Sequence, residues 1–154
     1  VHASASLYEG WALYCEDLMQ EQGFLNREEH RFIMLRDRLW RALRVIIDVR
    51  IHTRGLSIGD ASKLMVEKLG FDQQAADAEL AWYSTAPTIP LCYASGYELI
   101  KAVREYQQQK DDFELKAFHD ALLQQGSIAL PLVIRRAFGE DAWSYARMKV
   151  FSGG

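Results

Sequence analysis

The chain has 154 residues, of which 49% are apolar and 25% charged, and its formal net charge at pH 7 is −3. This length and composition are typical of one globular domain with a hydrophobic core. The slight acidity gives no electrostatic basis for binding nucleic acid or an anionic membrane, and no apolar stretch approaches the roughly 20 residues that span a bilayer.

The first two helices are predicted from their end signals. Helix-forming residues run over 5–22 and stop at Gly23, a residue type that readily takes the left-handed conformation of helix ends. Asn26 can cap the next helix, because Glu29 follows it three residues later, as in a capping box. We expect this second helix to be long and to end just before Gly55.

The later elements follow from similar signals. Ser57 is expected to cap a third helix that ends at Gly70, and a fourth helix is expected over 72–86, stopped by Pro87. The remaining elements are a stiff loop over 85–90 and helices over 91–108, over 112–125, from 131 and over 141–151. No strand alternation or internal repeat is present. The sequence therefore predicts an all-α bundle of about six to eight helices, forming one domain over residues 1–154.

The second half of the long helix is apolar on most sides, which is typical of a buried helix. A polar stripe nevertheless runs along it at steps of four, three, four and four residues: Asp37, Arg41, Arg44, Asp48 and His52. One interpretation is ion pairing within the helix, with Asp37 joined to Arg41. In the same interpretation Arg44 pairs with Asp48. The other interpretation is that the stripe lines a cleft in which His52 faces a ligand.

Two acids and a glycine–tyrosine pair are further candidates. Glu9 and Glu16 stand two helical turns apart beside apolar residues, so they could serve a buried arginine of the stripe. Gly96, in the helix expected over 91–108, predicts close approach of another backbone or of a ligand. Tyr93, three residues earlier, is either a core side chain or a hydrogen-bond donor to a developing oxyanion.

Local motifs for metal binding or nucleophilic catalysis are absent from the sequence. It contains no HExxH, no CxxC, no glycine-rich phosphate loop and no GxSxG elbow. Cys15 and Cys92 are expected to be free buried thiols, with a single bridge between them as the alternative. The residues alone thus predict an all-helical domain with a polar stripe.

Four ordered segments, spread over most of residues 6–134, carry a resemblance to a known family. EGWALYCEDL resembles the motif EGWALYAE, and RALRVIIDVRIHTRGLS resembles RAxRLVVDTGIHxxGWS. ELAWYSTAPTIPLCYASG aligns without a gap to ExxRYxxxPGQALSYxxG, and FELKAFHDALLQQGSIALPL resembles FDxRxFHDxxLxxGxxPLxxL. These motifs belong to a bacterial family labelled a domain of unknown function. Its members look like gluzincin-type zinc metallopeptidases, distantly similar to carboxypeptidase Taq and the angiotensin-converting-enzyme group.

The resemblance implies the C-terminal part of a larger helical metallopeptidase. Two zinc-binding histidines and a general-base glutamate would lie in an upstream HExxPGHH-type segment, and Glu9 would be the third zinc ligand. The implied partners are a peptide substrate and this upstream domain of the same chain. Zinc is expected in the longer protein and not in this chain alone. A homodimer through an apolar groove beside Glu9 is a further expectation.

By the same analogy, His52 and Tyr93 are the candidate catalytic residues, which stabilise the oxyanion or hold the peptide backbone. Gly96 and Arg44 are candidates for binding substrate. Glu16 and Asp48 are expected to orient the groups that touch zinc or substrate. The rival hypothesis is a non-catalytic helical module with a regulatory or protein-interaction role.

The sequence departs from the family pattern at several positions. Trp82 replaces the arginine of ExxRY, and Thr88 replaces the glycine of PGQ. Cys92 stands before Tyr93 in place of serine, and Leu56 replaces the tryptophan of GW. If the missing arginine gripped a substrate carboxylate, specificity differs here or activity has been lost.

Overall fold

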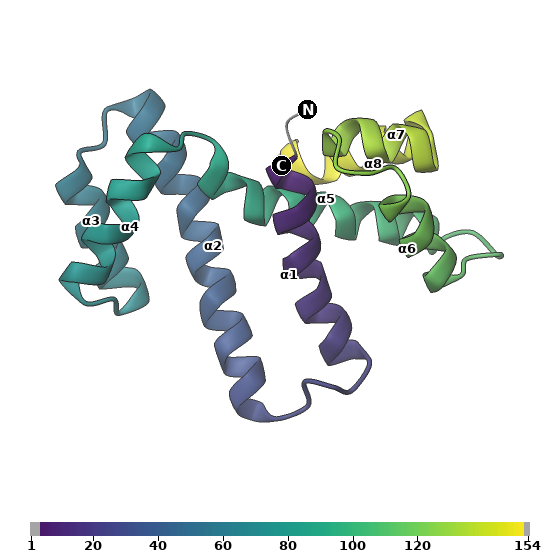
Figure 1. Cartoon of the computed structure of the whole chain (residues 1–154), viewed down its shortest axis with the longest axis horizontal. Coiled ribbons are helices and arrows are strands. Elements are labelled where there is room, and N and C mark those ends of the chain that lie inside the picture. Colours follow the sequence, from purple (N-terminus) through teal and green to yellow (C-terminus); the bar gives the residue numbers. More distant parts are fainter. Residues whose placement is uncertain (1–3, 153–154) are drawn as a thin grey trace. The chain divides into compact units, whose positions relative to one another are not determined.

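The computed structural model describes residues 4–152, which form eight α-helices and no strand, so the predicted all-helical fold is confirmed (Figure 1). The helices are α1 (Ala5–Glu21), α2 (Glu28–Arg54), α3 (Ile58–Leu69), α4 (Gln73–Thr85), α5 (Ile89–Gln107), α6 (Leu115–Leu123), α7 (Leu130–Phe138) and α8 (Glu140–Phe151). None of these helices, within the part of the chain that is described, is long and apolar enough to cross a bilayer.

The chain divides into two compact units. The central unit consists of residues 16–94 and contains α2, α3 and α4. The terminal unit consists of residues 4–15 and 95–152 and contains α6, α7 and α8. The boundaries between the units fall within α1 and α5. That residues 1–154 act as one domain stays a prediction.

The core of the central unit lies between three helices. In this unit α3 packs against α4, and both pack against α2. Their apolar faces enclose a cluster of fully buried residues: Ile47, Ala61, Met65, Ala76, Leu80 and Tyr83. Because Tyr83 belongs to this core, its hydroxyl group is brought to the polar side chains of α2.

The terminal unit contains a close backbone crossing between the first part of α1 and α5. A Cβ atom added to Gly96 would lie 2.0 Å from the carbonyl oxygen of Ser6. One added to Gly10 would lie 2.4 Å from the carbonyl carbon of Gly96. The close approach expected at Gly96 is therefore made by another backbone. Nearby, the Tyr14 hydroxyl and Nε2 of His119 lie 2.7 Å apart and link α1 to α6.

Most predicted helix ends are confirmed, and one cap is wrong. Ser57 accepts a hydrogen bond from the backbone N–H of Asp60 at 3.1 Å, and α3 ends at Gly70 in the left-handed conformation. Gly55 ends α2 with a φ of 67°. Asn26 does not cap α2, because the capping position is occupied by Arg27, whose side chain makes no capping hydrogen bond. The start of α2 therefore lacks a side-chain cap.

The connection between α4 and α5 is shorter than the predicted loop over 85–90. The turn occupies only residues 86–88, and α5 begins at Ile89. Thr88 has a φ of 73°, the left-handed region that a β-branched residue rarely adopts. Its backbone N–H donates to Oδ1 of Asp48 at 3.3 Å. A buried carboxylate thus holds a strained turn, at the position where the family motif has glycine.

Replacing Thr88 with glycine is expected to raise the free energy of unfolding by about 0.5–1 kcal/mol, because glycine adopts positive φ without the steric cost of a branched side chain. The hydrogen bond to Asp48 uses the backbone and is kept. Urea unfolding followed by circular dichroism measures the change. As a control, Thr53→Gly in the last turn of α2 should lower stability, since it removes the hydrogen bond that the Thr53 hydroxyl donates to the Val49 carbonyl and adds the backbone freedom of glycine. A lower free energy of unfolding in Thr88→Gly would show that the positive φ of Thr88 does not destabilise the turn.

The expectation that α2 is buried on most sides is wrong. Ile46 and Val49 are 46% and 40% exposed. Arg44, Ile47 and Asp48 are buried instead. The face that packs on α3 and α4 therefore carries both apolar and charged residues, and an apolar face remains open. A helix that reads as apolar all round can have this arrangement when its polar residues find buried partners.

Candidate functional site

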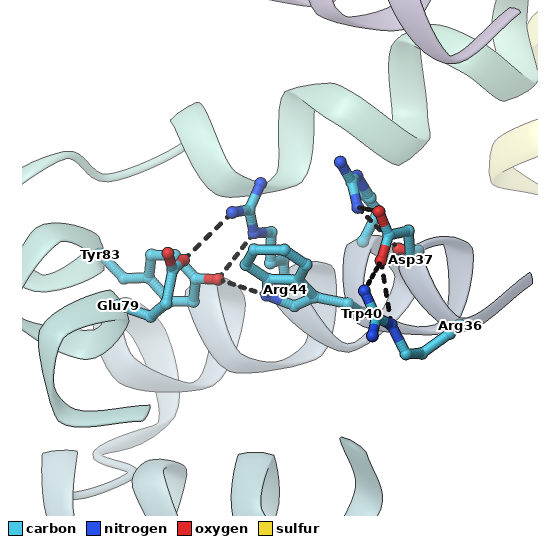
Figure 2. Close-up of polar contacts among 7 residues, drawn as sticks. Arg36, Asp37, Trp40, Arg44, Glu79 and Tyr83 are labelled. Atoms are coloured by element: carbon cyan, nitrogen blue, oxygen red, sulfur yellow. Dashed lines mark hydrogen bonds and ion pairs between the residues drawn. The ribbon is translucent and has the colours of Figure 1, made fainter. Parts of the chain in front are cut away.

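Arg44 is the centre of a buried polar network in the central unit. Its side chain reaches from α2 to α4, where its Nε donates to the Tyr83 hydroxyl at 2.7 Å and its Nη2 donates to Oε2 of Glu79 at 3.1 Å (Figure 2). Nε1 of Trp40 donates to the same Tyr83 hydroxyl at 3.1 Å. Burial raises the pKa of Tyr83, so the phenol stays neutral and accepts both hydrogen bonds.

Aromatic rings surround the Arg44 guanidinium. Its central carbon lies 4.3 Å from the ring centre of Trp40 and 4.8 Å from that of Tyr93. The ring centres of Trp82 and Tyr83 are each 5.5 Å away. Such contacts favour a cation, and more strongly where water is excluded. Trp82 stands where the motif has arginine, so this chain places a ring beside Arg44 instead of a second positive charge.

The pairing within α2 is confirmed for one pair and wrong for the other. Nη1 of Arg41 lies 3.2 Å from Oδ2 of Asp37, as expected. Arg44, however, pairs with Glu79 and not with Asp48. Arg44 is only 6% exposed, so its charge needs a partner that lies within reach in the folded chain. Glu79, on the neighbouring helix, meets that need.

Asp48 orients His52 from the same face of α2. Nε2 of His52 lies 3.4 Å from Oδ1 of Asp48 and 3.2 Å from the backbone oxygen of Tyr83. Because both neighbours are acceptors, Nε2 carries the proton, and Nδ1 is left without a partner among the described residues. The His52 side chain is 27% exposed. The imidazole is therefore held by one nitrogen and accessible from solvent.

The Asp48 carboxylate is also incompletely satisfied. Its Oδ1 accepts from Thr88, whereas its Oδ2 is buried and has no hydrogen-bond partner among the described residues. The residue as a whole is only 1% exposed. A buried carboxylate oxygen without a donor is destabilising, because no hydrogen bond compensates for its lost hydration. The supporting role expected for Asp48 stays a prediction.

The two acids of α1 have different surroundings. Glu16 belongs to the central unit; burial raises the pKa of its carboxyl group, and the charge of Arg41 acts in the opposite direction. Glu9 belongs to the terminal unit, where it is half-buried, and its carboxylate has no hydrogen-bond or ion-pair partner among residues 4–152. Neither acid serves Arg44, whose partner is Glu79.

The candidate residues divide between the two units. The central unit brings together Arg44, Asp48, His52 and Tyr93 and also contains Glu16. The terminal unit contains Glu9 and Gly96. A pocket shared by Glu9, His52 and Tyr93 stays a prediction. At Gly96, the atoms closest to an added Cβ belong to the α1 backbone.

Three members of the Arg44 network were not among the predicted site residues. Glu79 and Tyr83 are the first and last letters of the ExxRY motif, so the resemblance already marked them. Trp40 lies four residues before Arg44, one helical turn away on the same face. No local signal linked α2 to α4, because contacts between helices depend on the folded chain.

The described residues do not form a complete metal site. Within residues 4–152, no group of three His, Cys, Asp or Glu side chains is placed to hold a metal ion. Glu9 fits the chemistry of a single ligand, since its carboxylate is partly accessible and not engaged elsewhere. Cys15 and Cys92 form no disulfide bond, as expected, but the expectation that both are buried is wrong, because each is partly exposed.

Comparison with known proteins relates this chain to a described family. Residues 2–136 match the family described as "Bacterial protein of unknown function (DUF885)". No curated protein matches the chain.

A solved structure is similar over most of the chain. It is described as "a putative lipoprotein of unknown function from Shewanella oneidensis", and it shares 31% sequence identity with a TM-score of 0.75. The match covers 85% of this chain and 24% of that chain. This chain therefore spans about a quarter of the length of its structural relative.

Proposed function

Since the chain belongs to the bacterial DUF885 family, we propose that it forms the C-terminal portion of a zinc-dependent peptidase. In this proposal, residues 1–154 supply one zinc ligand and the groups that hold the substrate. An upstream HExxH-bearing segment of a longer polypeptide supplies the remaining ligands and the general base. Zinc bound there would polarise the scissile carbonyl and acidify the attacking water.

The observation that carries the proposal is the orientation of His52. Its Nε2 is held between Asp48 and the Tyr83 carbonyl, while Nδ1 has no partner among the described residues. An imidazole fixed in this way and still accessible can donate from Nδ1, when protonated, to an oxyanion or a peptide carbonyl. The accessible second nitrogen leaves the imidazole able to contact a ligand from solvent.

The other residues have supporting roles in this proposal. Glu9 is the zinc ligand, because its carboxylate is free of partners among the described residues. Tyr93, whose ring packs on Arg44, holds the peptide or the oxyanion through its phenol. Arg44 acts mainly by fixing Tyr83, whose carbonyl orients His52. Gly96 lets α1 carry Glu9 close to α5.

The test compares the 154-residue chain with the longer polypeptide. Calorimetry on the chain alone should detect no zinc binding at micromolar affinity, because one carboxylate cannot replace two imidazoles. In the longer polypeptide, Glu9→Gln should weaken zinc binding by about 100-fold or more, by analogy with the loss of groups that support a ligand. His52→Gln should retain zinc and lower kcat/KM on peptides by about 10²–10³-fold.

The matched control is Glu98→Gln, an exposed acid on α5, which should change neither zinc affinity nor kinetics. Micromolar zinc binding at Glu9 in the isolated chain would contradict the proposal. Full activity in the Glu9→Gln variant would also contradict it. Zinc-free, inactive longer protein would instead support the non-catalytic module.

A further inference from the structure

An exposed apolar seam runs along α2, on the face opposite the Arg44 network. Its residues follow one another at steps of three, four, three, four and three: Phe32, Leu35, Leu39, Ala42, Ile46 and Val49. All six are exposed, the five large ones by between 40% and 67%. This spacing is the heptad repeat with which one helix packs along another.

The seam differs from scattered surface apolar residues. Single exposed apolar side chains are ordinary, whereas a continuous apolar stripe marks an interaction surface. At its C-terminal end the seam forms a hollow, lined by Val45, Ile46 and Val49 together with Arg50 and Arg54. The opposite side of α2 is already occupied by α3 and α4. The surface is thus shaped for one additional helix.

Positive charge flanks the seam. Arg31, Arg50 and Arg54 border it and have no ion-pair partner among the described residues. Arg36 also borders it and reaches its neighbour Asp37. Two copies of this seam would bring arginines against arginines, because residues beside the seam meet across a helix pair. The charges therefore disfavour a second copy and favour a helix with acidic flanks.

We infer that the seam receives an amphipathic helix with acidic flanks, from a part of the same polypeptide outside residues 1–154. The match covers only 24% of the similar solved chain, so most of that chain lies outside the matched part and is long enough to include such a helix. The inference shares with the proposed function only the premise of a longer polypeptide. It requires neither zinc nor hydrolysis.

The first test uses the 154-residue chain and two designed 21-residue peptides with leucine at the heptad seam positions. One peptide has glutamate beside the seam, and its twin has lysine. The acidic peptide should bind saturably and at least about tenfold more tightly than its twin, because only its charges complement the arginines. Leu39→Glu and Ile46→Glu should each abolish binding with an unchanged helical spectrum. Leu132→Glu, an exposed apolar position on α7, is the matched control.

Reversing the charge of two arginines beside the seam tests whether they select the acidic peptide. In a chain with Arg50→Glu and Arg54→Glu, the preference should invert towards the lysine peptide. Equal binding of both peptides, or binding of neither, overturns the inference. So does a dimer of the unmodified chain in sedimentation that Leu39→Glu dissolves.

The second test identifies the source of the helix. A photo-reactive benzophenone side chain at position 39 of the longer polypeptide should cross-link within the molecule, to a segment outside residues 1–154. Cross-links to a second copy, to a separate protein or to residues 1–154 would each overturn the inference. The adduct should persist in the Glu9→Gln variant. Unchanged zinc affinity in that variant, with the adduct retained, would thus contradict the proposed function alone.

Discussion

Replacing Gly96 with alanine is expected to lower the free energy of unfolding by about 3 kcal/mol, the upper range for forcing extra atoms into a packed site. The new Cβ would lie 2.0 Å from the backbone oxygen of Ser6. A carbonyl oxygen on a helix cannot rotate away as a side chain can. The two helices must separate, and the contacts around the crossing are lost with them.

Chemical denaturation with a matched glycine distinguishes this clash from a general effect of alanine. Gly59 lies in α3, and an added Cβ there meets no atom within 4 Å. Gly59→Ala should therefore raise stability by about 0.5–1 kcal/mol, since alanine favours a helix. Gly10→Ala should resemble Gly96→Ala, and the double variant should lose less than the sum, because both open the same crossing. An unchanged free energy of unfolding in Gly96→Ala would contradict the close backbone crossing of α1 and α5.

Replacing Arg44 with methionine is the second large expected effect, a loss of about 3 kcal/mol in the free energy of unfolding. Removing one partner of a buried ion pair usually costs roughly 3–5 kcal/mol. The lower value applies because the Glu79 side chain is 27% exposed and regains some hydration. The Tyr83 hydroxyl also loses a donor at 2.7 Å. Arg44→Lys should show a smaller loss in the free energy of unfolding, since an ammonium group cannot reach both Tyr83 and Glu79 as a guanidinium does.

A double-mutant cycle tests whether the pair is the cause. Glu79→Gln combined with Arg44→Met should be more stable than the two separate losses predict, because no buried charge is then left unpaired. Arg36→Met is the control: its pair with Asp37 is exposed, so the change should stay within about 0.5 kcal/mol. An equally small effect of Arg44→Met would show that the network carries little stability.

The Arg44 network also matters for the proposed function, because it fixes the backbone that orients His52. Tyr83 is bound through its hydroxyl to Arg44 and through its carbonyl to Nε2 of His52. A change at Arg44 therefore reaches the imidazole through one shared residue. In the longer polypeptide, the zinc and kinetic measurements on His52→Gln remain the direct test, since they do not depend on overall stability.

The helices could be predicted from the sequence because their signals lie within a few residues of one another. Ser57 caps α3 through Asp60, and Gly55 and Gly70 end helices at positive φ. Each depends on a single turn of backbone. The cap expected at Asn26 failed although its pattern was correct, because α2 begins one position later, after Arg27. Helix boundaries are the least certain part of such a prediction.

The site could be predicted only in its local part. The pair of Asp37 and Arg41 lies within one turn of α2, and its spacing was sufficient to predict it. The partner of Arg44 was not predictable in the same way, because Glu79 is 35 residues away along the chain. The family motifs marked both residues but not their contact.

By itself, the sequence determined the all-helical class, most helix ends and the residues that carry charge into apolar surroundings. These depend on backbone preference and on side-chain spacing within a helix. Only the tertiary structure decided which acid neutralises Arg44, which nitrogen of His52 is held, and that Gly96 meets the backbone of Ser6. It also decided which apolar face of α2 stays open. Such choices depend on the helices that pack together, and a buried group takes whichever partner that packing brings within reach.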